Sequence, residues 1–207
     1  MVDINIEILQ LPFEEAKSEL LELEDRGFIH VILVYPVLEN GEYEFPEMIE
    51  KFQRLKGEVK NINLMLGNLI HYHSSMAHRL KQKHILTLND TEYILLELPL
   101  DSKPQLLEEA IEYLSDYKVI IYKPHKCKYF NYKALVELKK LGARYLVSYE
   151  DTANRLVRKL LKKEMIDFIV AGVCDKVHID KRILKKMSDK YSQEIVEANF
   201  KEIVYKA

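Results

Sequence analysis

The hydrophobic positions along the chain follow two alternating patterns. Short apolar runs such as HVILVY and YILLEL are rich in β-branched and aromatic residues, which is typical of buried strands. Longer stretches between them place apolar residues at helical spacing, so that Ala16, Leu20 and Leu23, for example, share one face. The predicted strands are Val2–Ile8, His30–Tyr35, Ile62–Leu66, Tyr93–Leu98, Val119–Tyr122, Tyr145–Ser148 and Phe168–Ala171. The predicted helices are Phe13–Arg26, Pro46–Glu58, Pro104–Ser115, Tyr132–Leu141, a helix capped by Asp151 or Thr152 that ends near Lys163, and Lys181–Glu197.

This order of elements predicts the fold class. About seven strand–helix units with continuously apolar strands indicate an α/β protein with a parallel sheet. So many units in 207 residues favour a closed or distorted barrel over an open sheet, in a single domain spanning residues 1–207. In such barrels functional residues gather where the strands end at their carboxyl edge. The stretch Ile70–Asn89, rich in His, Lys and Ser, is the segment expected to depart from the regular pattern.

Composition excludes several classes of function. The formal net charge of −2 argues against a surface dedicated to nucleic acid. No apolar run reaches the roughly 18–20 residues needed to span a bilayer, so we expect no membrane insertion. Nothing resembles a secretory leader, and Cys127 and Cys174 form neither a disulfide framework nor a closely spaced metal pair. We therefore expect a cytoplasmic protein.

The first predicted strand has an unusual polar face. Asn5 and Glu7 alternate with isoleucines, so both polar side chains point to one side of a strand. An opening of the form Asp-x-His-x-His would place two metal-binding imidazoles there. This chain offers an amide and a carboxylate instead.

Four stretches together resemble a known family. They are MVDINIEIL at the start, LGNLIHY at 66–72, LTLNDTEYILLELP at 86–99 and YSQEIVEANFKEIV at 191–204. They are similar to the PHP-family (polymerase and histidinol phosphatase) tyrosine phosphatases of bacterial capsule and exopolysaccharide operons. The resemblance implies a distorted TIM-like (β/α)7 barrel of the PHP type. It also implies about three divalent metals, usually manganese, whose bound hydroxide attacks phosphotyrosine.

Most of the ligands that the resemblance implies are replaced in this sequence. The two leading histidines correspond to Asn5 and Glu7, and the histidine of a Thr-Pro-His motif to Val37. The glutamate of a Gly-Asn-Glu motif corresponds to Leu69, whereas the glutamate that follows YILL is retained as Glu97. Aliphatic side chains cannot hold a hard cation.

The later motifs continue this trend. The His-Pro-Glu-Arg motif that the resemblance implies is replaced by Lys123-Pro124-His125-Lys126. The implied Ser-Asp-x-His motif is replaced by Ala171-Gly172-Val173-Cys174. Lys123, Gly172 and Cys174 therefore stand at remnant positions of the family site. We therefore expect no metal cofactor; any residual metal would be held by Glu7 and Glu97. Lys123 is predicted to lie within salt-bridge distance of Glu97 or Glu7 and to compensate their charge, the alternative being a solvent-facing lysine.

Three further features carry alternative interpretations. His71 and His73 form either a relocated metal site or a polar surface segment. The run Lys123, His125 and Lys126 either binds an anion or lies in a solvated loop. The last predicted helix packs on the barrel, with a homo-oligomer contact as the alternative.

The interpretation that these residues favour is a degenerate phosphatase homologue that binds or regulates rather than hydrolyses. Its implied partner is a tyrosine kinase or another protein of the polysaccharide system. One alternative is an active tyrosine phosphatase with a reduced manganese site. Another is an anion-binding or small-molecule-binding module.

Overall fold

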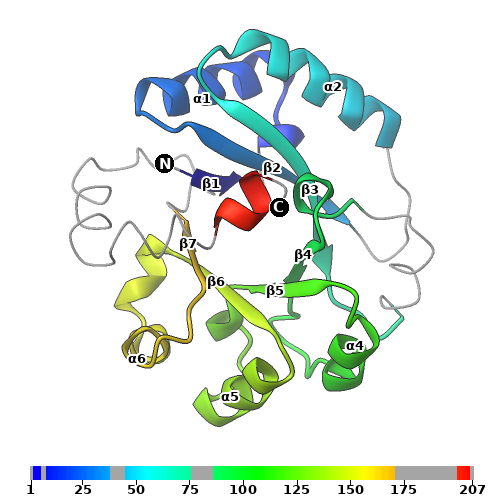
Figure 1. Cartoon of the computed structure of the whole chain (residues 1–207), viewed down its shortest axis with the longest axis vertical. Helices are drawn as coiled ribbons and strands as arrows, with labels where there is room; N and C mark the ends of the chain where they lie inside the picture. The colour runs from blue at the N-terminus through cyan, green and yellow to red at the C-terminus, as the bar shows by residue number, and fades with distance from the viewer. Residues whose placement is uncertain (1, 6–7, 38–44, 76–85, 171–199, 206–207) are drawn as a thin grey trace.

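The computed structural model describes residues 2–5, 8–37, 45–75, 86–170 and 200–205, and it shows a seven-stranded sheet in the order β1 to β7 (Figure 1). Each neighbouring pair of strands is parallel. The strands are β1 Val2–Asn5, β2 His30–Val37, β3 Asn63–His71, β4 Tyr93–Glu97, β5 Lys118–Tyr122, β6 Arg144–Ser148 and β7 Phe168–Val170. The two edge strands, β1 and β7, contact each other, so the sheet curves into a nearly closed barrel. The predicted α/β barrel is confirmed.

Helices lie on the outside of the barrel, as Figure 1 shows. The α-helices are α1 Phe13–Asp25, α2 Phe45–Glu58, α4 Leu107–Tyr113, α5 Tyr132–Lys140 and α6 Arg155–Lys162. Short 3-10 turns are η1 Ile8–Gln10, η2 Leu88–Asp90, η3 Pro124–Lys126 and η4 Tyr149–Ala153. Residues 200–204 form a further helical turn. None of the helices in the described part of the chain is long and apolar enough to cross a membrane.

Strand residues alternate between two apolar environments. Ile32 and Val34 belong to a cluster inside the barrel, whereas Val31 and Leu33 pack with residues of α1 and α2 outside it. Because both faces of the sheet are covered, the strands are apolar at nearly every position. This explains the continuous runs in the sequence.

Gly67 allows a close approach inside the barrel. A Cβ atom at this position would lie 2.6 Å from Leu88 Cδ2 and 3.2 Å from Leu88 Cα. The second contact is to backbone, which cannot rotate away. A side chain on Gly67 would therefore push η2 away from β3, and this accounts for the glycine in LGNL.

The amino-terminal end of the barrel is closed by residues 200–205. Phe200 and Ile203 are fully buried in the interior cluster, and the Phe200 ring lies 5.1 Å from that of Phe168. The Asn89 side-chain amide donates a hydrogen bond of 2.7 Å to the Ile203 carbonyl. The closing segment therefore completes the core.

Several predicted boundaries are wrong in detail. The helix expected to start at Asp151 or Thr152 starts at Arg155, because the Asn154 side chain accepts hydrogen bonds from the Leu156 and Val157 amides and acts as its N-cap. The third strand extends to His71, into the stretch expected to be irregular, and β1 ends at Asn5. The helix expected at Pro104–Ser115 is confined to Leu107–Tyr113. The predicted helix Lys181–Glu197 lies outside the described residues.

Candidate functional site

The site begins where β5 and β6, two neighbouring strands, end at the same edge of the barrel. Lys123 follows β5 directly and has a φ of 44°, in the left-handed region that bulky residues seldom adopt. Its amide donates a hydrogen bond of 2.8 Å to the Leu146 carbonyl of β6. This contact fixes the turn and brings Lys123 next to the residues that follow β6. A strained backbone held by its surroundings is a common property of functional sites.

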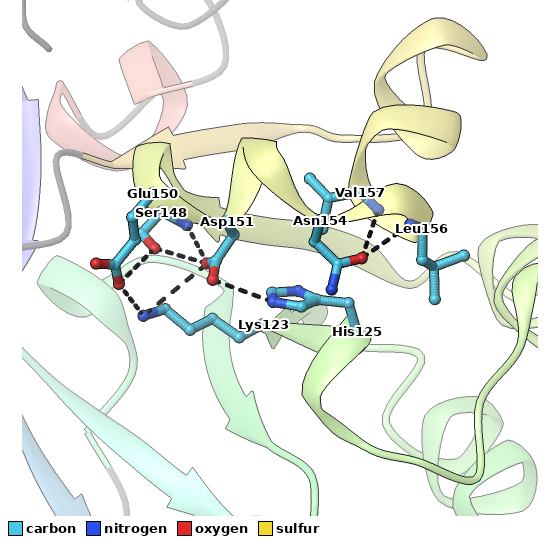
Figure 2. Close-up of polar contacts among 8 residues, drawn as sticks. All are labelled: Lys123, His125, Ser148, Glu150, Asp151, Asn154, Leu156 and Val157. Atoms are coloured by element: carbon cyan, nitrogen blue, oxygen red, sulfur yellow. Dashed lines mark hydrogen bonds and ion pairs between the residues drawn. The ribbon is translucent and has the colours of Figure 1, made fainter.

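The Lys123 side chain is buried and paired with two carboxylates (Figure 2). Its exposed fraction is 5%, and Nζ lies 3.1 Å from Glu150 Oε1 and 3.9 Å from Asp151 Oδ2. Nζ also lies 5.3 Å from the centre of the Tyr122 ring, where a cation is attracted by the aromatic face. An ammonium group taken out of water needs such compensation.

Asp151 is the centre of this cluster. The Ser148 amide donates to Asp151 Oδ2 over 2.9 Å, and Ser148 Oγ lies 2.6 Å from the same oxygen. His125 Nε2 lies 3.1 Å from the other oxygen, Oδ1. Burial alone would raise the pKa of Asp151, but the hydrogen bonds from His125 and Ser148 and the charge of Lys123 outweigh it and lower the pKa to about 2. Asp151 is therefore ionised throughout the physiological range.

His125 is oriented by Asp151. Its side chain is 5% exposed, and an ionised Asp151 can only accept, so the Nε2 atom that faces it carries a proton. The other ring nitrogen, Nδ1, is buried and has no hydrogen-bond partner among the described residues. Lys126, two positions from Pro124, is exposed.

Glu97 ends β4, the strand next to β5, and its register partner there is Tyr122. His71 and Glu97 are register partners at the ends of β3 and β4, and His71 Nδ1 lies 2.8 Å from Glu97 Oε2. Their side chains are 41% and 29% exposed, so water screens this pair. Among the described residues Lys123 forms ion pairs with Glu150 and Asp151, neither of which was predicted as its partner. Of its two predicted partners, Glu97 contacts His71, and Glu7 lies outside the described residues, so a pair with Glu7 stays a prediction. The two carboxylates that Lys123 contacts belong to η4, the turn that follows β6.

Some of the remaining candidate positions lie within the described residues and the others lie outside them. Val37 and Leu69 are buried apolar residues, and His73 lies beyond β3 with its Nδ1 2.8 Å from Ser75 Oγ. The Asn5 backbone ends β1. Glu7, Gly172 and Cys174 lie outside the described residues. Within the described ranges, no three His, Cys, Asp or Glu side chains are grouped so that they could hold a metal ion.

The sequence analysis did not predict Ser148, Glu150 and Asp151 as site residues, because it assigned residues 149–151 to the start of a helix. The signal was nevertheless present. Lys123 and this segment each follow directly after a strand, and the two strands are consecutive, so their ends meet at one edge of a parallel barrel.

Residues 14–205 match the family model described as capsular polysaccharide synthesis, CpsB/CapC. The chain belongs to the CpsB/CapC family. This confirms the resemblance found from the sequence motifs. No curated protein sequence matches the chain.

One solved structure supports the fold of this CpsB/CapC protein. It comes from "Crystal structures of YwqE from Bacillus subtilis and CpsB from Streptococcus pneumoniae, unique metal-dependent tyrosine phosphatases". The match covers 98% of this chain and 92% of the other, with a TM-score of 0.82 and 19% sequence identity. At 19% sequence identity, this structural similarity shows the barrel fold alone.

Proposed function

We propose that this CpsB/CapC protein has lost the metal-dependent hydrolytic centre implied by the family resemblance and acts as a binding or regulatory protein in capsule or exopolysaccharide synthesis. It would do so as a single cytoplasmic domain spanning residues 1–207. The proposed partner is a tyrosine kinase or another protein of the polysaccharide system.

The observation that carries the proposal is the buried Lys123 ammonium. It stands at a position where the resemblance implies a metal-binding histidine, and Asp151 and Glu150 already balance its charge. A divalent cation brought beside it would be repelled, and this repulsion is strong where water is excluded. Lysine thus supplies a fixed positive charge at this part of the barrel edge without any metal.

The other described positions support the same conclusion. Val37 and Leu69 are buried aliphatic residues that offer no electron pair to a cation. Glu97 contacts His71, and among the described residues no third metal-ligating side chain is grouped with these two. The described residues at these positions therefore do not fit a manganese cluster.

A second candidate function is a phosphatase with a reduced manganese site. The contact of 2.8 Å between His71 and Glu97 favours it, because an imidazole and a carboxylate on neighbouring strand ends are two ligands of suitable type. Glu7 would have to complete the set.

One experiment separates the two candidates. The purified protein is assayed with manganese against p-nitrophenyl phosphate and a tyrosine phosphopeptide, and its metal content is measured by elemental analysis. We expect neither bound manganese nor metal-dependent turnover. Turnover that disappears in Glu97→Ala but persists in Lys103→Ala, an exposed lysine in the loop before α4, would favour the reduced phosphatase instead.

A further inference from the structure

The outer face of α6 carries a stripe of positive charge. Arg155, Arg158, Lys159 and Lys162 follow the spacing i, i+3, i+4 and i+7, which places them on one side of a helix. All four side chains are exposed, and Lys163 at the helix end is exposed as well. Among the residues that the structure describes, none of these five takes part in an ion pair. We call these five residues the α6 stripe.

The opposite face of α6 is used by the fold. Val157 and Leu160 are fully buried, and Leu156 and Leu161 are partly buried against the core. The helix lies on the outside of the barrel next to α5 (Figure 1), and Lys159 Nζ sits 3.8 Å from the centre of the Tyr132 ring of α5. The orientation of the stripe is therefore fixed: it faces away from the barrel.

Folding stability accounts for only part of the stripe: the helix dipole favours Lys159 and Lys162 in the last turn, and Lys159 stacks on Tyr132, but neither effect explains Arg155 and Arg158. Like charges three and four residues apart destabilise a helix. The first turn of α6 contains no acidic residue and begins with Arg155, although the positive end of the helix dipole favours acidic residues there. The protein as a whole has a net charge of −2, so the stripe is a local concentration and not a reflection of composition. Local rules broken on one exposed face are a sign of function.

The positive charge of the α6 stripe indicates an anionic ligand. We propose that the α6 stripe is a docking surface for an acidic segment of a partner protein. A helix of 8 residues is about 12 Å long, which matches about four residues of an extended chain. A narrow row of cations complements the carboxylates or phosphates along such a segment. An anionic membrane is a poorer match, because none of the exposed large hydrophobic side chains of the described residues belongs to α6 and could insert into lipid.

The stripe also lies close to the Lys123 cluster. Asn154, which caps α6, follows η4, the turn that carries Glu150 and Asp151. The amino-terminal end of α6 is therefore at the carboxyl edge of the strands, and the stripe leads away from it along the outer wall. A segment bound to α6 would place the neighbouring part of its partner at the barrel edge. The docking surface does not depend on whether that edge holds metal.

The test uses the full-length protein and a fluorescein-labelled octaglutamate peptide, with an octaglutamine peptide carrying the same label as the reference. Binding is followed by fluorescence anisotropy. We expect the octaglutamate peptide alone to bind, with an affinity that falls as salt is added. Photo-crosslinking of the bound peptide, followed by mass spectrometry, should label α6 and its neighbour α5.

Two double variants localise the binding. Arg158→Glu with Lys162→Glu should weaken binding about tenfold or more, because each reversal replaces an attraction by a repulsion. Lys56→Glu with Lys103→Glu changes the net charge equally at exposed lysines elsewhere, and it should weaken binding by less than about threefold. Both variants should retain the circular dichroism spectrum of the wild type.

Three results would overturn the proposal. The first is equal binding of the two peptides by the wild type. The second is an equal loss of affinity in both double variants. The third is sedimentation with phosphatidylserine vesicles, lost in the α6 variant, while the octaglutamate peptide does not bind; the stripe would then recognise lipid.

Discussion

At the amino-terminal ends of the strands, Lys118 and Glu202 lie near the surface over a buried apolar closure, whereas at the carboxyl ends Lys123 and Asp151 are buried. Lys118 and Glu202 form an ion pair of 2.9 Å with side chains that are 36% and 47% exposed, above the fully buried Phe200. Lys123 and Asp151 are only 5% and 9% exposed. The difference indicates that apolar burial stabilises the amino-terminal end, whereas the buried charges mark the carboxyl end as the candidate functional site.

The amino-terminal end follows the ordinary rules of folding. Glu202 accepts a hydrogen bond from the Tyr93 hydroxyl, to which Arg144 Nη1 also donates over 2.8 Å. Burial, reinforced by the hydrogen bond to Glu202, raises the pKa of Tyr93 to about 12, so this hydroxyl remains protonated. These polar contacts orient the closing segment, and apolar burial supplies most of its stability.

The largest effect is expected from Phe200→Ala. This substitution empties a fully buried site between Phe168 and the barrel interior. Substitutions of this kind cost about 3–5 kcal/mol, because the surroundings close the cavity only in part. Urea unfolding followed by circular dichroism measures the change. A loss below about 1 kcal/mol would mean that residues 200–205 do not close the barrel in solution.

Asp151→Ala should have the next largest effect, about 3 kcal/mol. The change removes the acceptor for Ser148 and His125 and leaves the buried Lys123 with Glu150 as its remaining carboxylate partner among those described here. Urea unfolding again gives the free energy. If Lys123→Met in the same background recovers part of the loss, the uncompensated ammonium is the cause.

The pH dependence of stability should separate the cluster from the rest of the protein. The pKa of Asp151 is lowered in the folded state to about 2, so its contribution is fully present above its ordinary pKa of 3.8. It is lost as the pH falls through this range towards 2. The difference in unfolding free energy between wild type and Asp151→Asn should therefore be constant above about pH 5 and shrink below pH 4. A difference that does not change with pH would contradict the assignment.

The smallest effects should come from the exposed carboxylates at the two ends. Glu202→Gln and Glu150→Gln should each cost less than about 1 kcal/mol, because these side chains are 47% and 57% exposed and water screens their ion pairs. Measured side by side in urea, they serve as matched controls for Phe200→Ala and Asp151→Ala. A cost above about 2 kcal/mol for Glu150→Gln would show that Lys123 depends on Glu150 rather than on Asp151.

The fold could be predicted largely from the sequence, because both faces of the strands are apolar and the helices have amphipathic spacing. The site could be predicted only in part. Lys123 was predicted to compensate Glu97 or Glu7, with a solvent-facing lysine as the alternative; its burial and its contacts with Glu150 and Asp151 depend on the turns that follow β5 and β6. Asp151 also satisfies the rules for a helix cap, but only the structure shows that Asn154 caps α6, whereas Asp151 forms a capping box with Ser148 at the start of η4.

The most direct test of the central claim is a crystal structure of the protein grown with manganese, using anomalous scattering at the manganese edge. Our account predicts that Lys123 remains paired with Glu150 and Asp151 and that no anomalous peak lies among the carboxyl ends of the strands. Coordinated manganese at the ends of β1 to β7 would contradict it.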